Sequence, residues 1–237
     1  MKIAIVTGGS GNLGKFFSKE LLKMNYKVFC LDIKKPKISK NKNFIQYQVD
    51  ITDENEVKNF FKEINNIDLL INNAGIGVYT SSLERTSEDF KAVMNVNLLG
   101  NFLMTQNALK IMIKKRKGKI INIGSIYGVK SSNFNIYGKS KRNNSEVYSA
   151  TKAGVIMMTK YFAAHFSKKN IQINCISPGG IFANQDKKFV KKYENITPSG
   201  RMGSKKDLKS VLNFLIDKNN TYVNGQNISV DGGFLAW

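Results

Sequence analysis

The sequence predicts one α/β domain, a doubly wound parallel sheet of about seven strands with helices on both faces. Short apolar runs rich in Ile and Val recur along the 237 residues. They lack the polar alternation of half-exposed strands, which is typical of parallel strands covered on both faces. Most are separated by stretches long enough for a helix, and this order predicts right-handed crossovers into one sheet. We therefore expect a single unit over residues 1–237.

Seven runs fit the strand pattern and five stretches fit the helix pattern. The expected strands are Ile3–Thr7, Val28–Asp32, Phe44–Val49, Asp68–Ile71, Lys119–Gly124, Ile171–Ser177 and Asn227–Val230. The expected helices carry a capping residue or an apolar stripe at helical spacing. They are Asn12–Met24, a helix capped by Thr52 or Asp53 that runs toward Phe61, a long helix capped by Ser87 that ends near Lys115, Val147–Ser167 and Ser204–Ile216.

The charge balance bears on the partners of the protein. Lys and Arg number 37 and Asp and Glu number 17, which gives a net charge of +20. Such a charge can attract nucleic acid or anionic substrates. However, the lysines are scattered, and no recognition helix, zinc finger or aromatic-basic platform is found. We attribute the charge to overall composition and expect no nucleic-acid partner.

Targeting and metal-binding signals are also missing from the sequence. No charged-then-apolar leader precedes the first run, and no apolar run approaches the ~18 residues needed to span a bilayer. We therefore expect a cytoplasmic protein with no membrane partner. Cys30 and Cys175 lie in apolar runs, and His165 is the only histidine. These residues predict buried thiols and no metal site.

The first expected strand leads into a glycine-rich turn, Thr7-Gly8-Gly9-Ser10-Gly11-Asn12-Leu13-Gly14, and then into a helix. Glycines let the backbone turn tightly and approach a pyrophosphate, while the helix N-terminus offers unpaired N–H groups and a positive dipole end. Because the motif stands between a strand and a helix, it predicts a dinucleotide cofactor. The residues expected to bind it here are Gly8, Ser10, Gly11, Asn12, Leu13 and Gly14.

The ends of the next two strands indicate which dinucleotide is bound. The carboxylate of Asp32 can accept hydrogen bonds from both hydroxyls of an adenosine ribose and would repel a 2′-phosphate. It therefore predicts NAD over NADP, although Lys34 and Lys35 follow closely and could tolerate a phosphate. Asp50 and Ile51 end the third strand, where an acidic side chain is expected at the adenine edge.

Three residues indicate acid–base chemistry on a carbonyl group. Tyr148 and Lys152 are spaced i, i+4, which places both side chains on one helix face. A nearby ammonium favours the phenolate, so we expect it to lower the tyrosine pKa from about 10. Ser125 follows a strand at the carboxyl edge of the sheet, where such folds bind ligands. Its hydroxyl can donate to a substrate carbonyl oxygen as negative charge develops.

Together with further motifs, these residues resemble the short-chain dehydrogenase/reductase family, mostly its classical type, over essentially the whole chain. The matching motifs are Thr7-Gly8 to Gly14, Asp50, Asn72-Asn73-Ala74-Gly75, Asn97, Ser125, Tyr148 to Lys152, Pro178-Gly179 and Gly225-Gln226-Asn227 with Val230-Asp231-Gly232-Gly233. The resemblance implies a Rossmann-type fold and hydride transfer between the nicotinamide of NAD(P) and a secondary alcohol or ketone. It also implies a homodimer or homotetramer, with the two long helices as contact faces.

The resemblance further implies a role for each site residue. Tyr148 would be the acid/base, Ser125 would polarise the carbonyl, and Lys152 would hold the nicotinamide ribose and tune Tyr148. Asn97 would anchor a water that links Lys152 to solvent, or it could simply cap or kink its helix. The Asn-Asn-Ala-Gly turn would shape the pocket floor, or it could be purely structural. The remaining expected cofactor contacts are Asn73, Ala74, Gly75, Pro178, Gly179 and Ile181.

Two departures from the family pattern concern the cofactor. Asn12 stands where the usual loop has its second glycine, so the glycines follow the spacing of nucleotide-sugar epimerases and dehydratases. Ala183 occupies a position that often carries a threonine for the nicotinamide amide. That contact would have to come from elsewhere, with the Ile181 backbone and Asn184 as candidates.

A third departure concerns the substrate. Ser125 and Tyr148 are unusually far apart, and the added residues fall within 130–147, a loop expected to overhang the substrate. Its cationic residues Lys139, Lys141 and Arg142 suit a polar, sugar-like ligand, because ammonium and guanidinium groups pair with phosphate oxygens. A solvated surface loop is the alternative. The loop and residues 180–185 also resemble a bacterial subgroup linked to surface-sugar pathways.

Two other functions are alternatives to a reversible oxidoreductase. An epimerase or dehydratase with tightly bound NAD would fit the glycine spacing, but the chain lacks the extra C-terminal substrate domain of that subfamily. A nucleotide-sensing protein without catalysis would not need Ser125, Tyr148 and Lys152. The sequence therefore favours the oxidoreductase.

Overall fold

The computed structural model describes residues 1–34, 41–138 and 143–237. In this part of the chain, parallel strands form a seven-stranded sheet in the order β3-β2-β1-β4-β5-β6-β7. This confirms the predicted doubly wound fold. The strands are β1 (Lys2–Thr7), β2 (Tyr26–Asp32), β3 (Phe44–Gln48), β4 (Leu69–Asn72), β5 (Gly118–Ile123), β6 (Ile171–Pro178) and β7 (Asn227–Val230).

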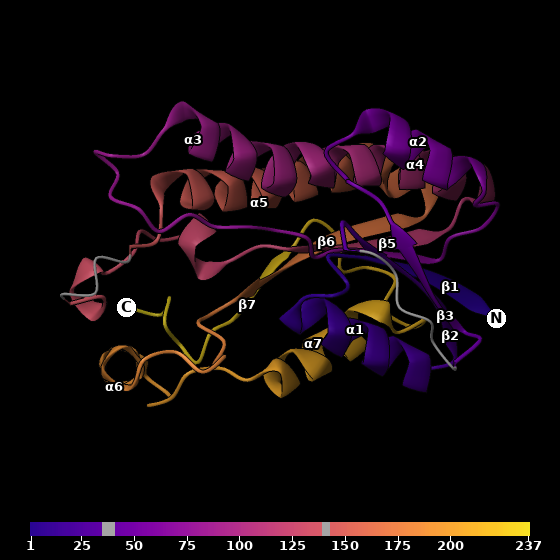
Figure 1. The fold of residues 1–237 in the computed structure, drawn as a ribbon. Helices are drawn as coiled ribbons and strands as arrows, with labels where there is room; N and C mark the ends of the chain where they lie inside the picture. The colour runs from indigo at the N-terminus through magenta and orange to yellow at the C-terminus, as the bar shows by residue number, and fades with distance from the viewer. Residues whose placement is uncertain (35–40, 139–142) are drawn as a thin grey trace.

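Helices cover both faces of the sheet (Figure 1). One face carries α1 (Asn12–Lys23) and α7 (Leu208–Ile216), and the other carries α2 (Glu54–Lys62), α4 (Gly100–Lys115) and α5 (Glu146–Phe166). Each interface has its own apolar core, which explains why the strands are apolar on both sides. In the part of the chain that the structure describes, no helix combines the length and the hydropathy required to cross a bilayer.

The long helix predicted from Ser87 to Lys115 is interrupted in its middle. It consists of α3 (Ser87–Met94), a π-helical turn over Asn95–Leu99, and α4. Its cap is Thr86 and not Ser87, because the Thr86 hydroxyl accepts a hydrogen bond from the backbone N–H of Asp89 at 3.1 Å. Single π turns within α-helices are frequent at functional sites, and this one carries Asn97.

The other helix starts are also set by capping side chains. Of the two candidates before α2, Asp53 is the cap, since its carboxylate accepts from the N–H groups of Asn55 and Glu56. The helix that carries Tyr148 begins at Glu146. The Ser145 hydroxyl caps it by accepting from the backbone N–H of Tyr148. The last predicted helix, α7, begins at Leu208 and not at Ser204, because a short 3₁₀ turn over Lys205–Asp207 precedes it.

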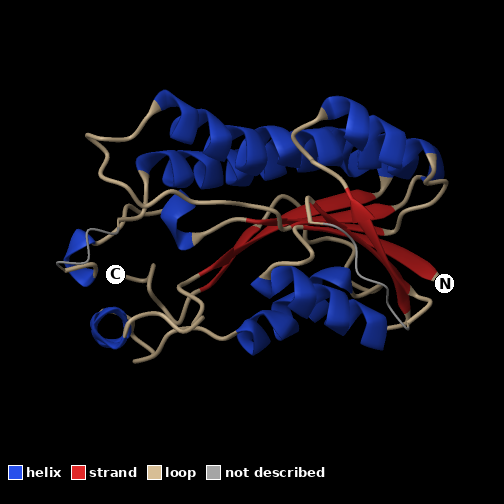
Figure 2. Ribbon diagram, viewed as in Figure 1, coloured by secondary structure: helices blue, strands red, loops and turns tan. Residues whose placement is uncertain are grey.

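One helix, α6 (Lys187–Asn195), was missed by the sequence analysis. It is short and Lys-rich, so its apolar face consists only of Phe189, Val190 and Tyr193. The Asp186 carboxylate caps it by accepting from two backbone N–H groups, at 3.0 and 3.2 Å. Its position beyond the end of the sheet, near the C-terminus, is visible in Figure 2.

The order of the strands determines where a ligand can bind. The chain winds outward in opposite directions from β1 and β4, which are neighbours at the centre of the sheet. In open α/β sheets, ligands bind in the crevice outside the carboxyl ends of the strands at this switch point. The turns after β1 and β4 lie there, and Ser125 follows β5 beside them.

Candidate active site

The glycine-rich turn after β1 fits tightly between the end of β4 and the start of α1. Gly8 has a φ of +61°, and a Cβ at this position would lie 2.8 Å from the Cα of Ala74. A Cβ at Gly14 would lie 2.2 Å from the carbonyl oxygen of Gly8. Gly11 is the N-cap of α1 and provides no side chain to cap it. The turn therefore leaves the N-terminus of α1 open to an anion, as a pyrophosphate cradle requires.

A groove of about 610 Å³ runs from this turn along the carboxyl edge of the sheet. It gathers most of the residues predicted to bind the cofactor, namely Gly8, Gly11, Asn12, Leu13, Asp32, Asp50, Ile51, Asn73, Ala74, Gly75, Lys152, Pro178, Gly179 and Ile181. Ser10 and Gly14 are not part of its lining. The backbone N–H of Ser10 donates to Oδ2 of Asp32 at 2.9 Å, and Gly14 packs under Gly8. Ser10 and Gly14 therefore support residues of the groove wall without lining the groove themselves.

Asp32 lies at one end of the groove. In addition to the contact with Ser10, its Oδ1 accepts from the backbone N–H of Lys34 at 3.1 Å. Two backbone donors thus fix the orientation of the carboxylate. Lys34 lines the same groove, whereas Lys35 lies outside the described residues.

The turn after β4 is held in place by side chains on both sides. Oγ1 of Thr7 accepts from the N–H groups of Asn73 and Ala74, each at 3.0 Å, and Nδ2 of Asn73 donates to the carbonyl oxygens of Thr7 and Gly8. Asn73 therefore positions the turn while also lining the groove. Asn72 faces the opposite way.

Asn72 belongs to a buried polar cluster on the face of the sheet that α4 and α5 cover. It pairs in register with Asn122 of β5, and its Nδ2 donates to Oδ1 of Asn122 and to Oγ1 of Thr105, both at 2.9 Å. Asn122 in turn donates to Thr159 of α5 at 2.9 Å. These contacts tie β4 and β5 to α4 and α5, so Asn72 has the structural role that the sequence analysis left open.

Asn97 also acts on the backbone after β4. Its Oδ1 accepts from the N–H of Ile76 at 2.8 Å, and its Nδ2 donates to the carbonyl oxygen of Ile76 at 3.0 Å and to Oγ1 of Thr151 at 3.1 Å. The π turn thus presents an amide that holds the cavity wall against α5. The water expected beside Asn97 stays a prediction.

A second cavity, of about 930 Å³, opens next to the groove. Ser125 and Tyr148 line both spaces, together with four residues of the neighbouring turns, Gly75, Ile76, Gly179 and Ile181. A molecule in the groove and a molecule in the cavity would therefore meet at the Ser125 and Tyr148 side chains. This is the arrangement needed for transfer between a cofactor and a substrate.

Lys152 is buried beneath this junction. Its Nζ donates to the carbonyl oxygen of Ile123 at 2.7 Å and lies 5.6 Å from the centre of the Tyr148 ring. Because burial disfavours the charged form, the pKa of Lys152 is lowered to about 8. The ammonium is thus held at the groove by a backbone carbonyl.

The pKa of Tyr148 moves in the direction opposite to the expectation. Desolvation by burial raises the pKa of the phenol, and a hydrogen bond with Ser125 opposes this only in part. The sequence predicts that Lys152 lowers this pKa, but loss of hydration outweighs the other influences. The raised pKa favours the protonated form of the phenol.

The predicted substrate loop lines the second cavity where the structure describes it. Ile136, Tyr137, Gly138 and Asn144 contribute to the wall, and a short 3₁₀ turn over Phe134–Ile136 precedes them. Lys139, Lys141 and Arg142 lie outside the described residues. The described part of the loop thus lines this cavity, and its position over a substrate stays a prediction.

The missed helix α6 forms the facing wall. The hydroxyl of Tyr193 accepts from the backbone N–H of Gly180 at 2.6 Å, and its ring stacks on Phe234 at a centroid distance of 5.3 Å. Gly180 leads into Ile181, which lines both spaces, whereas Asn184 lines neither. The sequence signal for this helix was the Asp186 cap followed by aromatic residues at 189 and 193.

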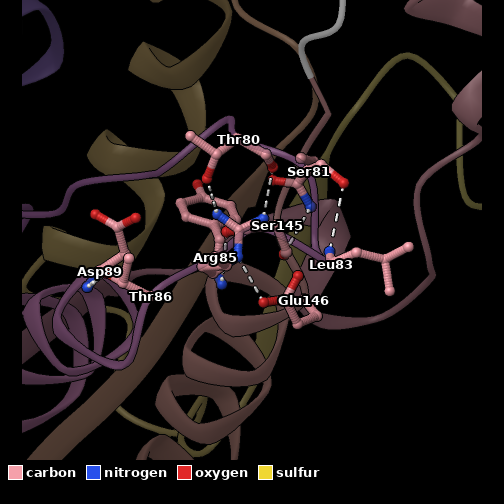
Figure 3. A network of polar contacts seen from close by, with 10 residues as sticks. Thr80, Ser81, Leu83, Arg85, Thr86, Asp89, Ser145 and Glu146 are labelled. Carbon is pink, nitrogen blue, oxygen red and sulfur yellow. Dashed lines mark hydrogen bonds and ion pairs between the residues drawn. The ribbon is translucent and has the colours of Figure 1, made fainter.

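A second group missed by the sequence analysis connects the wall after β4 to the start of α5 (Figure 3). Arg85 is almost fully buried, with 3% of its side chain exposed. Its Nε donates to Oε1 of Glu146 at 2.6 Å, and its Nη1 and Nη2 donate to the hydroxyl and carbonyl oxygens of Thr80 at 3.0 and 2.9 Å. One guanidinium thus fastens the loop that carries Tyr79 to the turn that leads to Tyr148.

Known proteins are similar to this chain in sequence and in fold. A family model described as short chain dehydrogenase matches residues 2–194. The chain belongs to the short-chain dehydrogenase/reductase family. It is therefore an oxidoreductase that acts on CH–OH or keto groups with NAD(P), in a Rossmann-type fold.

Curated members of the short-chain dehydrogenase/reductase family match nearly the whole chain. The 3-oxoacyl-(acyl-carrier-protein) reductase FabG of Thermotoga maritima is 32% identical, and the match covers 99% of this chain and 98% of that protein. Carbonyl reductase family member 4 of Xenopus tropicalis is 33% identical, with 98% and 97% covered. Both relatives are reductases, and nothing in the comparisons supports the alternative of an epimerase or dehydratase.

Solved structures superpose closely on the chain. A short chain dehydrogenase from Leptospira borgpetersenii with bound NAD+ is 44% identical, has a TM-score of 0.93, and is matched over 98% of this chain and 92% of that one. ElxO with bound NADP is 31% identical with a TM-score of 0.87, over 100% and 99% of the two chains. Both cofactors therefore occur among similar structures.

Proposed function

We propose that this short-chain dehydrogenase/reductase catalyses reversible, NAD-linked conversion between a secondary alcohol and a ketone on a polar, sugar-like substrate. The observation that carries this proposal is the position of Ser125 and Tyr148 at the junction of the groove and the cavity. The nicotinamide cofactor supplies or accepts the hydride when it is bound. The groove residues would hold it, and the cavity would hold the alcohol or ketone.

The side chains at the junction divide the remaining chemistry among them. In the reduction, Ser125 would donate a hydrogen bond to the carbonyl oxygen as negative charge develops there. Tyr148 would donate its phenolic proton to the same oxygen, and the raised pKa keeps that proton available at neutral pH. Lys152 would place a positive charge beside the tyrosine and favour its phenolate after the proton has left. In the oxidation, these steps run in reverse.

The preference for NAD is supported by Asp32. Its carboxylate lines the groove and is oriented by two backbone N–H groups, so a 2′-phosphate placed near it would be repelled. The Leptospira structure with bound NAD+ is in keeping with this preference. We expect kcat/KM for NAD to exceed that for NADP by at least about tenfold. A ratio in favour of NADP contradicts this part of the proposal.

A second candidate substrate is a 3-oxoacyl group. It is favoured by the name of the FabG relative and by the aromatic residues of the cavity, among them Tyr127, Tyr137 and Phe189. The two candidates are distinguished by measuring the formation or consumption of NADH with each member of a substrate panel. The panel contains sugar phosphates, sugar acids, polyols and 3-oxoacyl thioesters. Turnover confined to the thioesters would overturn the sugar-like substrate and leave the oxidoreductase chemistry intact.

We also propose that the protein is a cytoplasmic homodimer or homotetramer. Met157 and Tyr161 on α5 are 62% and 63% exposed, which is a large exposure for apolar side chains on the helix predicted as a contact face. Sedimentation equilibrium measures the number of subunits directly. A monomer at micromolar concentration contradicts the proposed assembly.

A further inference from the structure

We propose that Lys188 and Lys192 form an anion-binding position in the wall of the substrate cavity, so that the substrate carries a carboxylate or phosphate group. The inference deepens the proposed function, since it takes the cavity beside Tyr148 as the substrate site. It concerns a part of the wall that sequence analysis did not identify.

The two lysines share one side of α6. They are spaced i, i+4, which brings their side chains next to each other on the helix surface, and both line the 930 Å³ cavity. The same helix carries Lys187 and Lys191, and neither belongs to the described lining of that cavity. Two of the four lysines of α6 therefore line the cavity.

Contacts made by Lys192 itself and by its neighbours on α6 hold the pair in place. The Tyr193 hydroxyl accepts from the Gly180 N–H, and the rings of Phe189 and Tyr137 pack at a centroid distance of 5.6 Å. Nζ of Lys192 donates to the carbonyl oxygen of Asn135 at 2.9 Å, which fixes the ammonium beside the loop on the facing wall. An ammonium has three donors, so two remain available to a ligand.

The charges around the pair favour an anion. Within residues 1–34, 41–138 and 143–237, no ion pair joins either lysine to a carboxylate. Asp186 also lines the cavity, but its Oδ1 accepts from two backbone N–H groups at the start of α6. Two ammonium groups against one capping carboxylate leave this wall positive. Charge-assisted hydrogen bonds to such a wall stabilise a bound carboxylate or phosphate.

The test measures binding to the NADH-saturated protein, so that the pyrophosphate cradle is already filled. Glucose 6-phosphate is compared with glucose, and gluconate with glucitol, by isothermal titration. In the wild type, at least one anionic ligand is expected to bind more tightly than its neutral counterpart. Lys188→Gln with Lys192→Gln is expected to reduce this ratio about 10- to 100-fold, as the loss of hydrogen bonds to charged groups predicts. The two pairs distinguish phosphate from carboxylate.

The matched control is Lys187→Gln with Lys191→Gln, which removes the same charge from the same helix and should leave the ratio unchanged. The inference is overturned if neither anion is preferred by the wild type, or if both double variants lower the ratio equally. Failure of the proposed function gives a different result. In that case no alcohol or ketone would be turned over with NAD(H), whatever the binding ratios show.

Discussion

The Nε atom of Arg85 lies 2.6 Å from Oε1 of Glu146, and this contact joins the loop after β4 to the first turn of α5. Because Arg85 also donates twice to Thr80, its removal would release the loop that carries Tyr79 at the cavity. We expect Arg85→Ala to lower kcat/KM for the substrate about 5- to 30-fold, because the loop no longer positions the substrate. This fall corresponds to an activation free energy higher by about 1–2 kcal/mol.

The dissociation constant of NADH should stay unchanged in Arg85→Ala, because Arg85 does not line the groove. Fluorescence titration of NADH and steady-state kinetics measure the two effects separately. Lys58→Ala is the control, since it removes an exposed ion pair with Glu54 on α2. Equal weakening of NADH and substrate binding would indicate general destabilisation instead of positioning.

Removal of the Tyr148 hydroxyl tests the acid/base. Tyr148→Phe keeps the ring but cannot donate the proton, so kcat is expected to fall about 10²- to 10⁴-fold. NADH should still bind, because the groove keeps the rest of its lining. Tyr222→Phe changes a tyrosine that is 98% exposed and should be silent. Turnover of Tyr148→Phe near the wild-type rate would refute the role of Tyr148.

Two variants separate the effect of the close approach between Gly8 and Ala74 from the effect of the left-handed backbone at Gly8. Gly8→Ala adds a methyl group 2.8 Å from the Cα of Ala74 at a φ of +61°, whereas Gly200→Ala adds one at +67° with nothing within 4 Å. Both variants should lose about 1 kcal/mol of unfolding free energy to the left-handed conformation. Only Gly8→Ala should also weaken NADH binding, by at least about tenfold. Equal NADH affinities would show that the cradle tolerates the displacement.

The hydroxyl of Tyr193 should stabilise the turn after β6. In Tyr193→Phe the ring can still stack on Phe234, but the Gly180 N–H loses its acceptor. We expect the unfolding free energy to fall by about 1–2 kcal/mol and the KM for substrate to rise, as Gly180 lines the cavity. Denaturant titration measures the first effect. Tyr222→Phe, at a residue that is 98% exposed, should change neither.

The lowered pKa of Lys152 predicts a specific pH dependence of stability. Its pKa falls from an ordinary value of 10.5 to about 8 on folding, so above pH 8 the unfolded chain holds more protons at this position. The contribution of Lys152 to the unfolding free energy should therefore rise between pH 8 and pH 9, by about 1 kcal/mol. The same measurement on Lys152→Met should lack that rise. Parallel curves for the two proteins would show that Lys152 does not titrate there.

The positions of the main candidate site residues could be predicted from the sequence because local rules determine them. The glycine turn is recognisable from its place between a strand and a helix, and Ser125 and Tyr148 follow from a strand end and a helical spacing. The same reasoning places Asp32 at the groove, since a strand brings it to the carboxyl edge of the sheet.

The parts that escaped prediction depend on tertiary contacts. Helix α6 has four lysines in nine residues, and it is stable because Tyr193 and Phe189 pack against distant segments. Arg85 is one cation among many in the sequence, and only the fold brings it to Glu146, 61 residues away. The pKa of Tyr148 was misjudged for a similar reason, since burial is a property of the packed molecule.

The π turn over Asn95–Leu99 amounts to one extra residue in a continuous helical path, because its flanking residues Met94 and Gly100 both keep right-handed helical dihedrals. Each residue of an α-helix turns the chain by about 100°. Deleting a single residue here would restore the ordinary repeat and rotate α3 by about that angle against α4. Val93 and Met104, both fully buried, could then no longer both stay buried. The relative orientation of α3 and α4 thus depends on the one residue that the π turn adds.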